Sequence, residues 1–169
     1  MRASDFSLRA LYEALDAERQ ARGLSWAAAT REMNGRAERV SAGRHQMSAS
    51  TVKGVGKRTV AEGDGILAML RWLNRTPESF VQGLGDGARL PEVPAGKVLR
   101  FDTKRMHAAL EAQRVARGMI WEEVAKEVGL GVSSLKYLAN GGRTAFPQVM
   151  RIVRWLGRPA TEFTRMSDW

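Results

Sequence analysis

The sequence predicts an all-α protein made of two tandem domains, each with four to five helices. The main observation is an internal repeat: residues 6–33, shifted by 95, align with residues 101–128, and ten of the 28 positions are identical. Further along, a shift of 83 aligns Arg71-Trp72-Leu73 with Arg154-Trp155-Leu156. A period of this length in only two copies indicates a duplicated domain. Apolar residues recur at helical spacing, and no segment alternates with the period of two expected of a strand.

The first two helices of copy one are predicted from an apolar stripe and two end signals. The stripe consists of Leu8, Leu11, Tyr12 and Leu15. Gly23 supplies the left-handed residue that ends this helix, and Ser25 is the expected N-cap of a second helix from Trp26 to Met33. Copy two repeats the pattern with Gly118 and a helix from Trp121 to Val128.

A third and a fourth helix follow in each copy. The third is expected from Ser133 to Asn140 in copy two and from Ser48 or Ser50 to about Val55 in copy one. Gly54 and Gly56 weaken the copy-one helix, because each costs up to about 1 kcal/mol relative to alanine. The fourth helix is predicted from matched stripes, which are Ile66, Met69, Leu70 and Leu73 in copy one and Val149, Ile152, Val153 and Leu156 in copy two.

Both predicted domains are basic. Breaker-rich residues 83–98 form the linker between a first domain at residues 1–82 and a second domain at residues 99–169. The first has 13 basic against 9 acidic residues and the second 12 against 7, so both contribute to the net charge of +9. Positive charge on each domain favours a polyanionic partner such as nucleic acid. The alternative is an ordinary arginine-rich protein, since arginine outnumbers lysine by 21 to 6.

The composition argues against several classes of site. The absence of cysteine excludes disulfides, thiolate zinc sites and cysteine nucleophiles. His45 and His107 lack ligand spacing, so they are expected to be surface residues, and no metal site is predicted. No apolar run reaches the roughly 18 residues of a membrane span, and a cytoplasmic location is expected. No phosphate-binding loop or nucleophile–histidine pair indicates an enzyme, and no cofactor is expected.

A helix-turn-helix pattern is the basis of the functional prediction. In copy two, the helix at 121–128, a turn at Gly129-Leu130-Gly131 and the helix from Ser133 follow one another closely. Together with Trp155-Leu156-Gly157, these residues resemble the lambda-repressor/Cro-like helix-turn-helix family, in particular a bacterial subgroup with tryptophan opening the second helix. In copy one the resemblance covers Arg22-Gly23-Leu24-Ser25-Trp26, residues 48–53 and residues 70–73. It implies two lambda-repressor-like DNA-binding domains in tandem.

The resemblance also implies that each third helix lies in the major groove and reads base edges. The implied DNA-binding residues of copy two are Ser133, Ser134, Lys136 and Tyr137, with Asn140 and Arg143 nearer the DNA backbone. Those of copy one are Ser48, Ser50, Thr51 and Lys53, with Lys57 and Arg58 on phosphates. Hydroxyl groups can bond to either base type, and lysine suits guanine or phosphate. Trp26 and Trp121 stand where many family members carry a glutamine that reads adenine.

Copy one contains an insertion from Asn34 to about His45, which accounts for the change in shift. Its arginines, Arg36, Arg39 and Arg44, are predicted to form either a basic arm or a binding loop. An arm would follow phosphates or enter the minor groove of DNA. A loop would bind a partner protein or the other domain, in which case copy one would have lost groove reading. Copy two is therefore the expected better reader of DNA.

Several recurring side chains have a structural interpretation beside the functional one. Trp26, Trp72, Trp121 and Trp155 are expected to pack in the core rather than stack on bases. Tyr137, which aligns with Gly54, is either a DNA contact or an exposed surface residue. Arg71 and Arg154 are expected to cap a helix, hold a carboxylate or contact a phosphate.

The sequence thus predicts a DNA-binding transcriptional regulator, such as a repressor, of bacterial or phage origin. Its partner would be double-stranded DNA, bound by two tethered domains that act as a pseudo-dimer, since tethering raises affinity through effective concentration. The chain would act as a monomer with this internal pseudo-dimer or as a homodimer. The alternative is a protein-interaction adaptor or antitoxin-like protein whose helical domains bind a partner protein.

Overall fold

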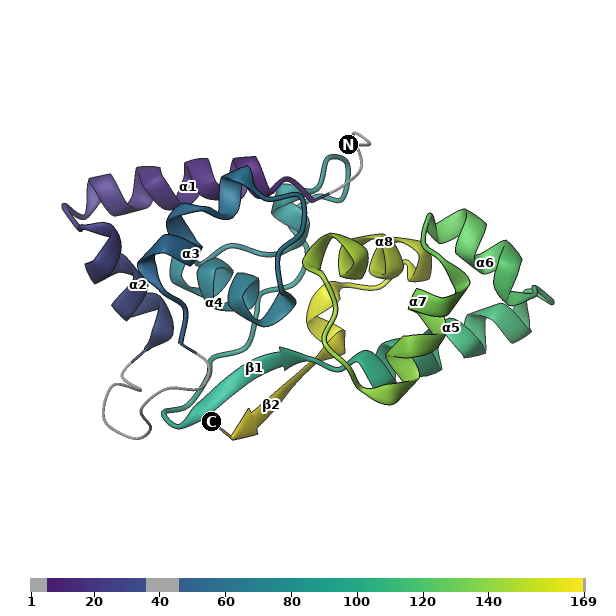
Figure 1. Cartoon of the computed structure of the whole chain (residues 1–169). Helices are drawn as coiled ribbons and strands as arrows, with labels where there is room; N and C mark the ends of the chain where they lie inside the picture. Colours follow the sequence, from purple (N-terminus) through teal and green to yellow (C-terminus); the bar gives the residue numbers. More distant parts are fainter. Residues whose placement is uncertain (1–5, 36–45, 169) are drawn as a thin grey trace.

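The computed structural model describes residues 6–35 and 46–168, which contain eight α-helices, four short 3-10 helices and one two-stranded antiparallel sheet (Figure 1). The mostly helical fold predicted from the sequence is confirmed for these residues. No helix among them is long and apolar enough to cross a membrane.

The helices fall into two sets with the same order. The first unit contains α1 (Leu8–Ala21), α2 (Trp26–Asn34), α3 (Ala49–Lys53), η2 (Val55–Lys57), α4 (Gly63–Leu73) and η3 (Glu78–Phe80). The second unit contains α5 (Thr103–Ala116), α6 (Trp121–Val128), α7 (Val132–Tyr137), η4 (Leu138–Asn140), α8 (Phe146–Leu156) and η5 (Ala160–Phe163). The bounds of α5 are those of α1 shifted by 95, and the bounds of α8 are those of α4 shifted by 83. The repeat read from the sequence is therefore also a repeat of secondary structure.

The predicted start of α2 and the predicted end of α1 are confirmed. The Ser25 hydroxyl accepts a hydrogen bond from the backbone N–H of Ala28 at the start of α2. Gly23 follows α1 with a left-handed φ of 65°. At the start of α6, where Ile120 replaces the capping serine, the Glu123 carboxylate accepts from the backbone N–H of Ile120 at 2.9 Å. A side chain one turn into the helix thus supplies one of the two bonds of a capping box.

The third helices are shorter than predicted. Each expected helix is a short α-helix followed by one turn of 3-10 helix, α3 with η2 and α7 with η4. Gly54 lies between α3 and η2 in a right-handed helical conformation. A Cβ on Gly56 would lie 2.7 Å from the Cβ of Tyr12, so η2 approaches α1 closer than any larger residue allows. Gly56 is therefore a requirement of helix packing as well as a weak helix former.

The prediction that the chain is entirely α-helical is wrong for two five-residue segments. Strand β1 (Lys97–Phe101) pairs with β2 (Thr164–Asp168), with Lys97 opposite Asp168 and Phe101 opposite Thr164. The first two residues of β1 belong to the predicted linker. Leu99 and Phe101 of β1 are buried and Val98 and Arg100 are half-buried, but β2 has no apolar alternation. The strands form because they flank the second unit and meet where its chain enters and leaves.

The two units are related by a local two-fold axis. Glu62 and Ala145, equivalent at the shift of 83, form an isolated antiparallel bridge with each other. The backbone N–H of Gly63 donates to the carbonyl of Thr144 at 3.2 Å, and the N–H of Phe146 donates to the carbonyl of Ala61 at 2.9 Å. These two bonds exchange places when the units are exchanged. In Figure 1, α4 of the first unit and α8 of the second lie at the centre of the molecule, and α1–α2 and α5–α6 lie at opposite ends.

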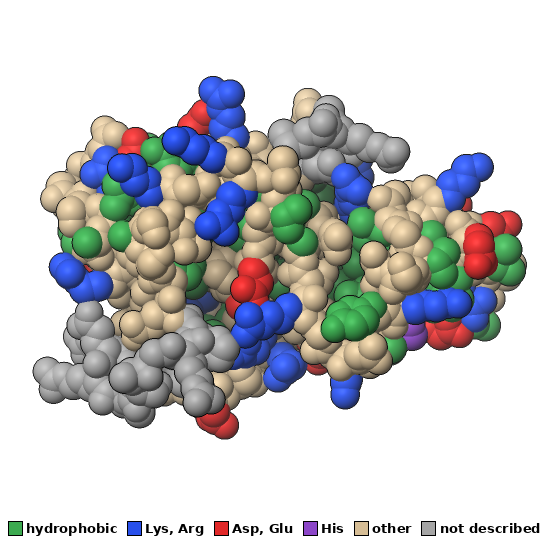
Figure 2. Space-filling view, in the orientation of Figure 1, with side chains coloured by type: hydrophobic (Ala, Val, Ile, Leu, Met, Phe, Trp, Pro, Cys, Tyr) green, Lys and Arg blue, Asp and Glu red, His purple; other side chains and the backbone are tan. Residues whose placement is uncertain are grey.

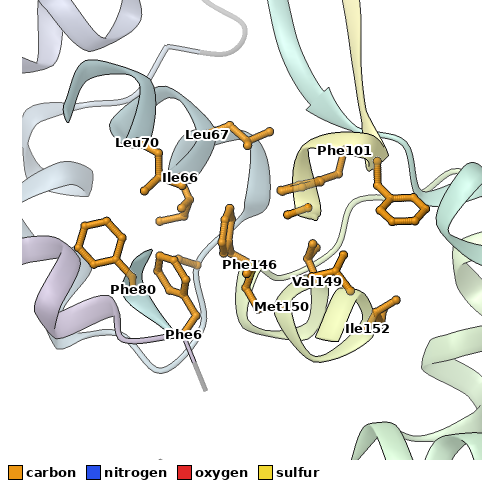
Figure 3. Close-up of a cluster of buried hydrophobic side chains, with 14 of the residues drawn as sticks. Phe6, Ile66, Leu67, Leu70, Phe80, Phe101, Phe146, Val149, Met150 and Ile152 are labelled. Carbon is orange, nitrogen blue, oxygen red and sulfur yellow. The ribbon is translucent and has the colours of Figure 1, made fainter. Parts of the chain in front are cut away.

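A continuous hydrophobic core joins the units (Figure 3). Phe6 at the entry to the first unit packs against Phe146 of α8, with ring centroids 4.6 Å apart. The equivalent contact places Phe101 on Gly63, where an added Cβ would lie 2.7 Å from the Phe101 ring. Phe6 and Phe146 are almost fully buried, together with Leu67 of α4. The division into two domains therefore stays a prediction, because both units contribute to one core.

Candidate nucleic-acid interface

The turn between α6 and α7 consists of three residues. The backbone N–H groups of Gly129 and Leu130 both donate to the carbonyl of Ala125, at 2.9 and 3.1 Å, which closes the end of α6. Gly129 has a φ of 78°, and Gly131 precedes the first residue of α7. A glycine in the left-handed region reverses the chain within one turn. The short turn and the contact between α6 and α7 fix the direction of α7.

The same relation holds between α2 and α3 despite the insertion. The Asn34 side chain accepts a hydrogen bond from the backbone N–H of Met47 and donates one to its carbonyl, both at 3.0 Å. This pair of bonds holds the two ends of the insertion together, and α3 packs on α2 as α7 packs on α6. Arg36, Arg39 and Arg44 lie outside the described residues, so the arm and the binding loop both stay hypotheses.

The predicted DNA-binding residues of the second unit share one exposed surface. Leu135 and Leu138 are buried and anchor α7 and η4 to the rest of the unit. The exposed residues between and beside these anchors are Ser133, Ser134, Lys136, Tyr137 and Asn140. The hydroxyl groups of Ser133 and Ser134 make no hydrogen bond within residues 6–35 and 46–168. The structure therefore brings these five side chains together on the outer side of the third helix.

In the first unit, Val52 and Val55 take the anchoring positions. Ser48, Ser50, Lys53, Lys57 and Arg58 are exposed, and Thr51 is half-buried. The Ser48 oxygen caps α3 by accepting from the backbone N–H of Thr51, and it lies 2.8 Å from the Ser50 hydroxyl and 2.9 Å from the Thr51 hydroxyl. Its counterpart in the second unit is Gly131, which has no side chain. The hydroxyls of the first unit thus bond to one another, whereas those of the second unit do not.

Tyr137 lies over the loop that follows η4. An added Cβ on Gly142 would lie 2.7 Å from the Tyr137 ring and 3.3 Å from its hydroxyl oxygen. The ring is still 57% exposed. Gly142 therefore leaves room for the large, exposed aromatic side chain at the end of α7. The first unit has Gly54 at the matching position and has no such side chain.

Arg143 belongs to the contact between the units. Its guanidinium bonds to the Glu62 carboxylate at 2.8 Å, and both side chains are about half exposed. Glu62 is one of the two residues in the bridge on the local axis. A second ion pair joins the units where Arg100 of β1 bonds to Asp64 of α4 at 2.8 Å. Burial raises the pKa of the Asp64 carboxyl, and the charge of Arg100 opposes this shift.

The charge around the third helices is one-sided. Residues 46–61 contain Lys53, Lys57 and Arg58 and no acidic residue, and residues 129–145 contain Lys136 and Arg143 and no acidic residue. No ion pair joins Lys53, Lys57, Arg58 or Lys136 to another residue of the described chain. Figure 2 shows Lys and Arg side chains spread over both units on one face. An unpaired cation in a segment without acids is suited to contact a phosphate.

Many of the other arginines have structural partners that repeat between the units. Arg22 and Trp72 both bond to Glu32, and Arg117 and Trp155 both bond to Glu127. In each cluster the guanidinium also lies over the indole ring. Hydrogen bonds from Arg117 and then Trp155 lower the pKa of the Glu127 carboxyl. The expectation that the recurring tryptophans have a packing role is supported, although all four are only half-buried.

The prediction that His107 is a plain surface residue is wrong. Its ring stacks on Trp121 at a centroid distance of 5.3 Å, as Tyr12 stacks on Trp26 in the first unit. His45 lies outside the described residues. The repeat itself was the missed signal, because position 107 aligns with an aromatic residue at position 12.

The recurring arginines of α4 and α8, Arg71 and Arg154, differ in burial. Partial burial lowers the pKa of the Arg71 guanidinium, against the opposite effect of the Glu92 charge. Arg154, its counterpart, is exposed. Burial and the Glu92 charge thus act on Arg71, and the three expected roles of this residue pair, capping a helix, holding a carboxylate or contacting a phosphate, stay predictions.

No protein family, curated protein or solved structure that was compared matches the chain. No cluster of three or more potential metal ligands occurs among residues 6–35 and 46–168. Function is therefore inferred from the arrangement of the third helices and from their charges.

Proposed function

We propose that the chain is a DNA-binding transcriptional regulator of bacterial or phage origin, in which α2–α3 and α6–α7 act as two lambda-repressor-like helix-turn-helix elements. The observation that carries this proposal is the matched chemistry of the two third helices. Ser50, Thr51 and Lys53 of α3 correspond to Ser133, Ser134 and Lys136 of α7. All but the half-buried Thr51 are exposed, and both segments lack acidic residues. Hydroxyl and lysine side chains suit contacts with base edges and phosphates.

Two separate readers in one chain give this proposal a physical rationale. Each third helix is short and carries few side chains able to reach DNA, so a single unit would bind weakly. When both units engage one duplex, the second binding event occurs at high effective concentration. The internal pseudo-dimer therefore supplies affinity that one unit lacks.

One observation favours the alternative of a protein-binding adaptor. Val115 and Ile120 are 61% and 57% exposed at the α5–α6 end of the second unit. Their counterparts in the first unit are the polar residues Gln20 and Ser25. An apolar side chain gained at an exposed position is typical of protein interfaces. This end lies away from the first unit in Figure 1.

Salt dependence of binding separates the two functions. Fluorescence anisotropy with a labelled random-sequence duplex measures the affinity of the full chain at about 50 and about 200 mM salt. With roughly 6 phosphate contacts, the affinity should fall about a thousandfold, because bound cations release counterions from DNA. Binding that hardly changes with salt, or no binding at the lower salt, would refute DNA as the partner and favour the adaptor.

A further inference from the structure

The spatial relation between two DNA-binding helices of one chain decides how the two half-sites are arranged on DNA. If the units repeat by translation, the half-sites on DNA form a direct repeat. If the units are related by a two-fold rotation, the half-sites form an inverted repeat. The distinction follows from the contact between the units, because a two-fold contact uses the same surface on both sides, whereas a translational contact uses two different surfaces.

The contact between these units uses the same surface on both sides. Glu62 bridges to its own counterpart, Ala145, in antiparallel fashion. The flanking hydrogen bonds, Gly63 to Thr144 and Phe146 to Ala61, are each other's counterparts. Helix α4 also contacts its own counterpart, α8. A translational relation would produce none of these self-equivalent pairings.

The two-fold axis sets how α3 and α7 can meet DNA. A two-fold rotation does not move an atom along the rotation axis. Helices α3 and α7 therefore lie at the same position along the axis, and they run in opposite directions perpendicular to it. A duplex laid across the axis has a two-fold axis of its own. When both third helices engage that duplex, they do so in opposite orientations, which corresponds to half-sites in an inverted arrangement.

The two units are nevertheless chemically unequal readers. The second unit has Tyr137 at the end of α7, and the equivalent residue of the first unit is Gly54. In the first unit, the Ser48 oxygen bonds to the hydroxyls of Ser50 and Thr51, which leaves them fewer free bonding positions than Ser133 and Ser134 have. The shared element is the lysine at the end of each third helix, Lys53 and Lys136.

The distance between the readers is fixed by buried contacts. The Phe6–Phe146 pair lies in the core between the units, and the Arg100–Asp64 ion pair ties β1 to α4. The Glu78 carboxylate of η3, 5% exposed, accepts from the backbone N–H of Ala160 in the second unit at 2.7 Å. A flexible tether would tolerate different half-site spacings, but a packed interface of this kind holds one.

We propose that the chain recognises an inverted repeat of two unequal half-sites at one fixed spacing, with the second unit contributing more of the specificity. This inference rests on the proposed function and adds the class of DNA site. It assigns the greater sequence discrimination to Ser133, Ser134, Lys136 and Tyr137, and a smaller share to Ser50, Thr51 and Lys53.

The test starts by selecting bound sequences from a random duplex library with the full chain. The better-defined half-site is then built into duplexes as an inverted repeat, as a direct repeat and as an inverted repeat with about 5 extra base pairs, half a helical turn. The inverted repeat at the selected spacing should bind at least about tenfold more tightly than the other two, because only there do both units engage. Equal affinity for direct and inverted repeats, or tolerance of the half-turn insertion, would overturn the proposal.

A matched pair of variants tests the inequality on the same inverted repeat. Ser133→Ala combined with Ser134→Ala should weaken binding more than Ser50→Ala combined with Thr51→Ala, because the hydroxyls of the first unit already bond to Ser48. Equal effects of the two double variants would refute the unequal half-sites. The random-sequence salt titration identifies a failure of the proposed function itself: if salt-dependent binding persists but no inverted repeat is preferred, only this inference fails.

Discussion

The positively charged residues fall into two groups: those that bond to other residues of the protein and those that are available to a ligand. The repeated arginines that directly follow α1 and α5, Arg22 and Arg117, bond to carboxylates and lie over indole rings. The lysines of the third helices, Lys53 and Lys136, have no such partners within the described chain. Net charge alone does not distinguish these two groups. Their different positions in the repeat do.

Glu127 should make the stability of the protein depend on pH. Its carboxylate is held by Arg117 and Trp155, which lower its folded-state pKa. A carboxyl with a lowered pKa contributes stability above its unfolded pKa of about 4.3, and that contribution is lost as the pH falls through the folded value. The melting temperature followed by circular dichroism should therefore decrease in acid less steeply for Glu127→Gln than for the unchanged protein. An equally steep decrease in both proteins would contradict this role of Glu127.

Gly56 tests the close packing of η2 on α1. Replacing Gly56 with alanine places a Cβ only 2.7 Å from the Cβ of Tyr12, which is closer than van der Waals contact allows. The change should destabilise the protein by about 1–3 kcal/mol through overpacking. Gly131→Ala is the control, because the nearest atom to its added Cβ is 3.8 Å away. Equal denaturation midpoints in urea for the two variants would contradict the packing described for η2.

At the scale of elements, the helices and their repeat followed from the sequence, whereas the strands and the contacts between units did not. Apolar stripes and caps such as Ser25 act within a few residues, so they are visible in the sequence. Strand β2 forms only because β1 lies beside it, and its own pattern of side chains is polar. The Glu62–Arg143 pair was missed for the same reason, because its partners are far apart in the chain.

The Asn34 clamp tests how α3 keeps its position despite the insertion. Asn34→Ala removes both hydrogen bonds to the Met47 backbone and leaves a half-buried N–H and carbonyl without their partner. The loss should cost about 1–3 kcal/mol and lower the affinity for DNA through displacement of α3. Gln46→Ala, at the exposed neighbouring residue, should change neither the urea midpoint nor the affinity. Unchanged stability in Asn34→Ala would show that other contacts position α3.

At the scale of the whole molecule, the two units should unfold as one. Their common core contains side chains from both, including Phe6 and Phe146. Phe146→Ala should cost about 3–5 kcal/mol, as large-to-small changes of buried aromatics do. Hydrogen exchange followed by mass spectrometry should then show α1 and α5 losing protection by a similar amount. Loss of protection confined to the second unit would mean that the units are independent domains, as the linker in the sequence suggests.

Both third helices should bind DNA, and the α5–α6 end should not. Hydrogen exchange of the full chain, measured with and without the best inverted-repeat duplex, tests this expectation directly. We expect slower exchange in residues 46–58 and residues 132–143 when DNA is bound, and unchanged exchange in residues 115–120. Protection of residues 115–120 alone, or no protection of either third helix by bound DNA, would contradict it.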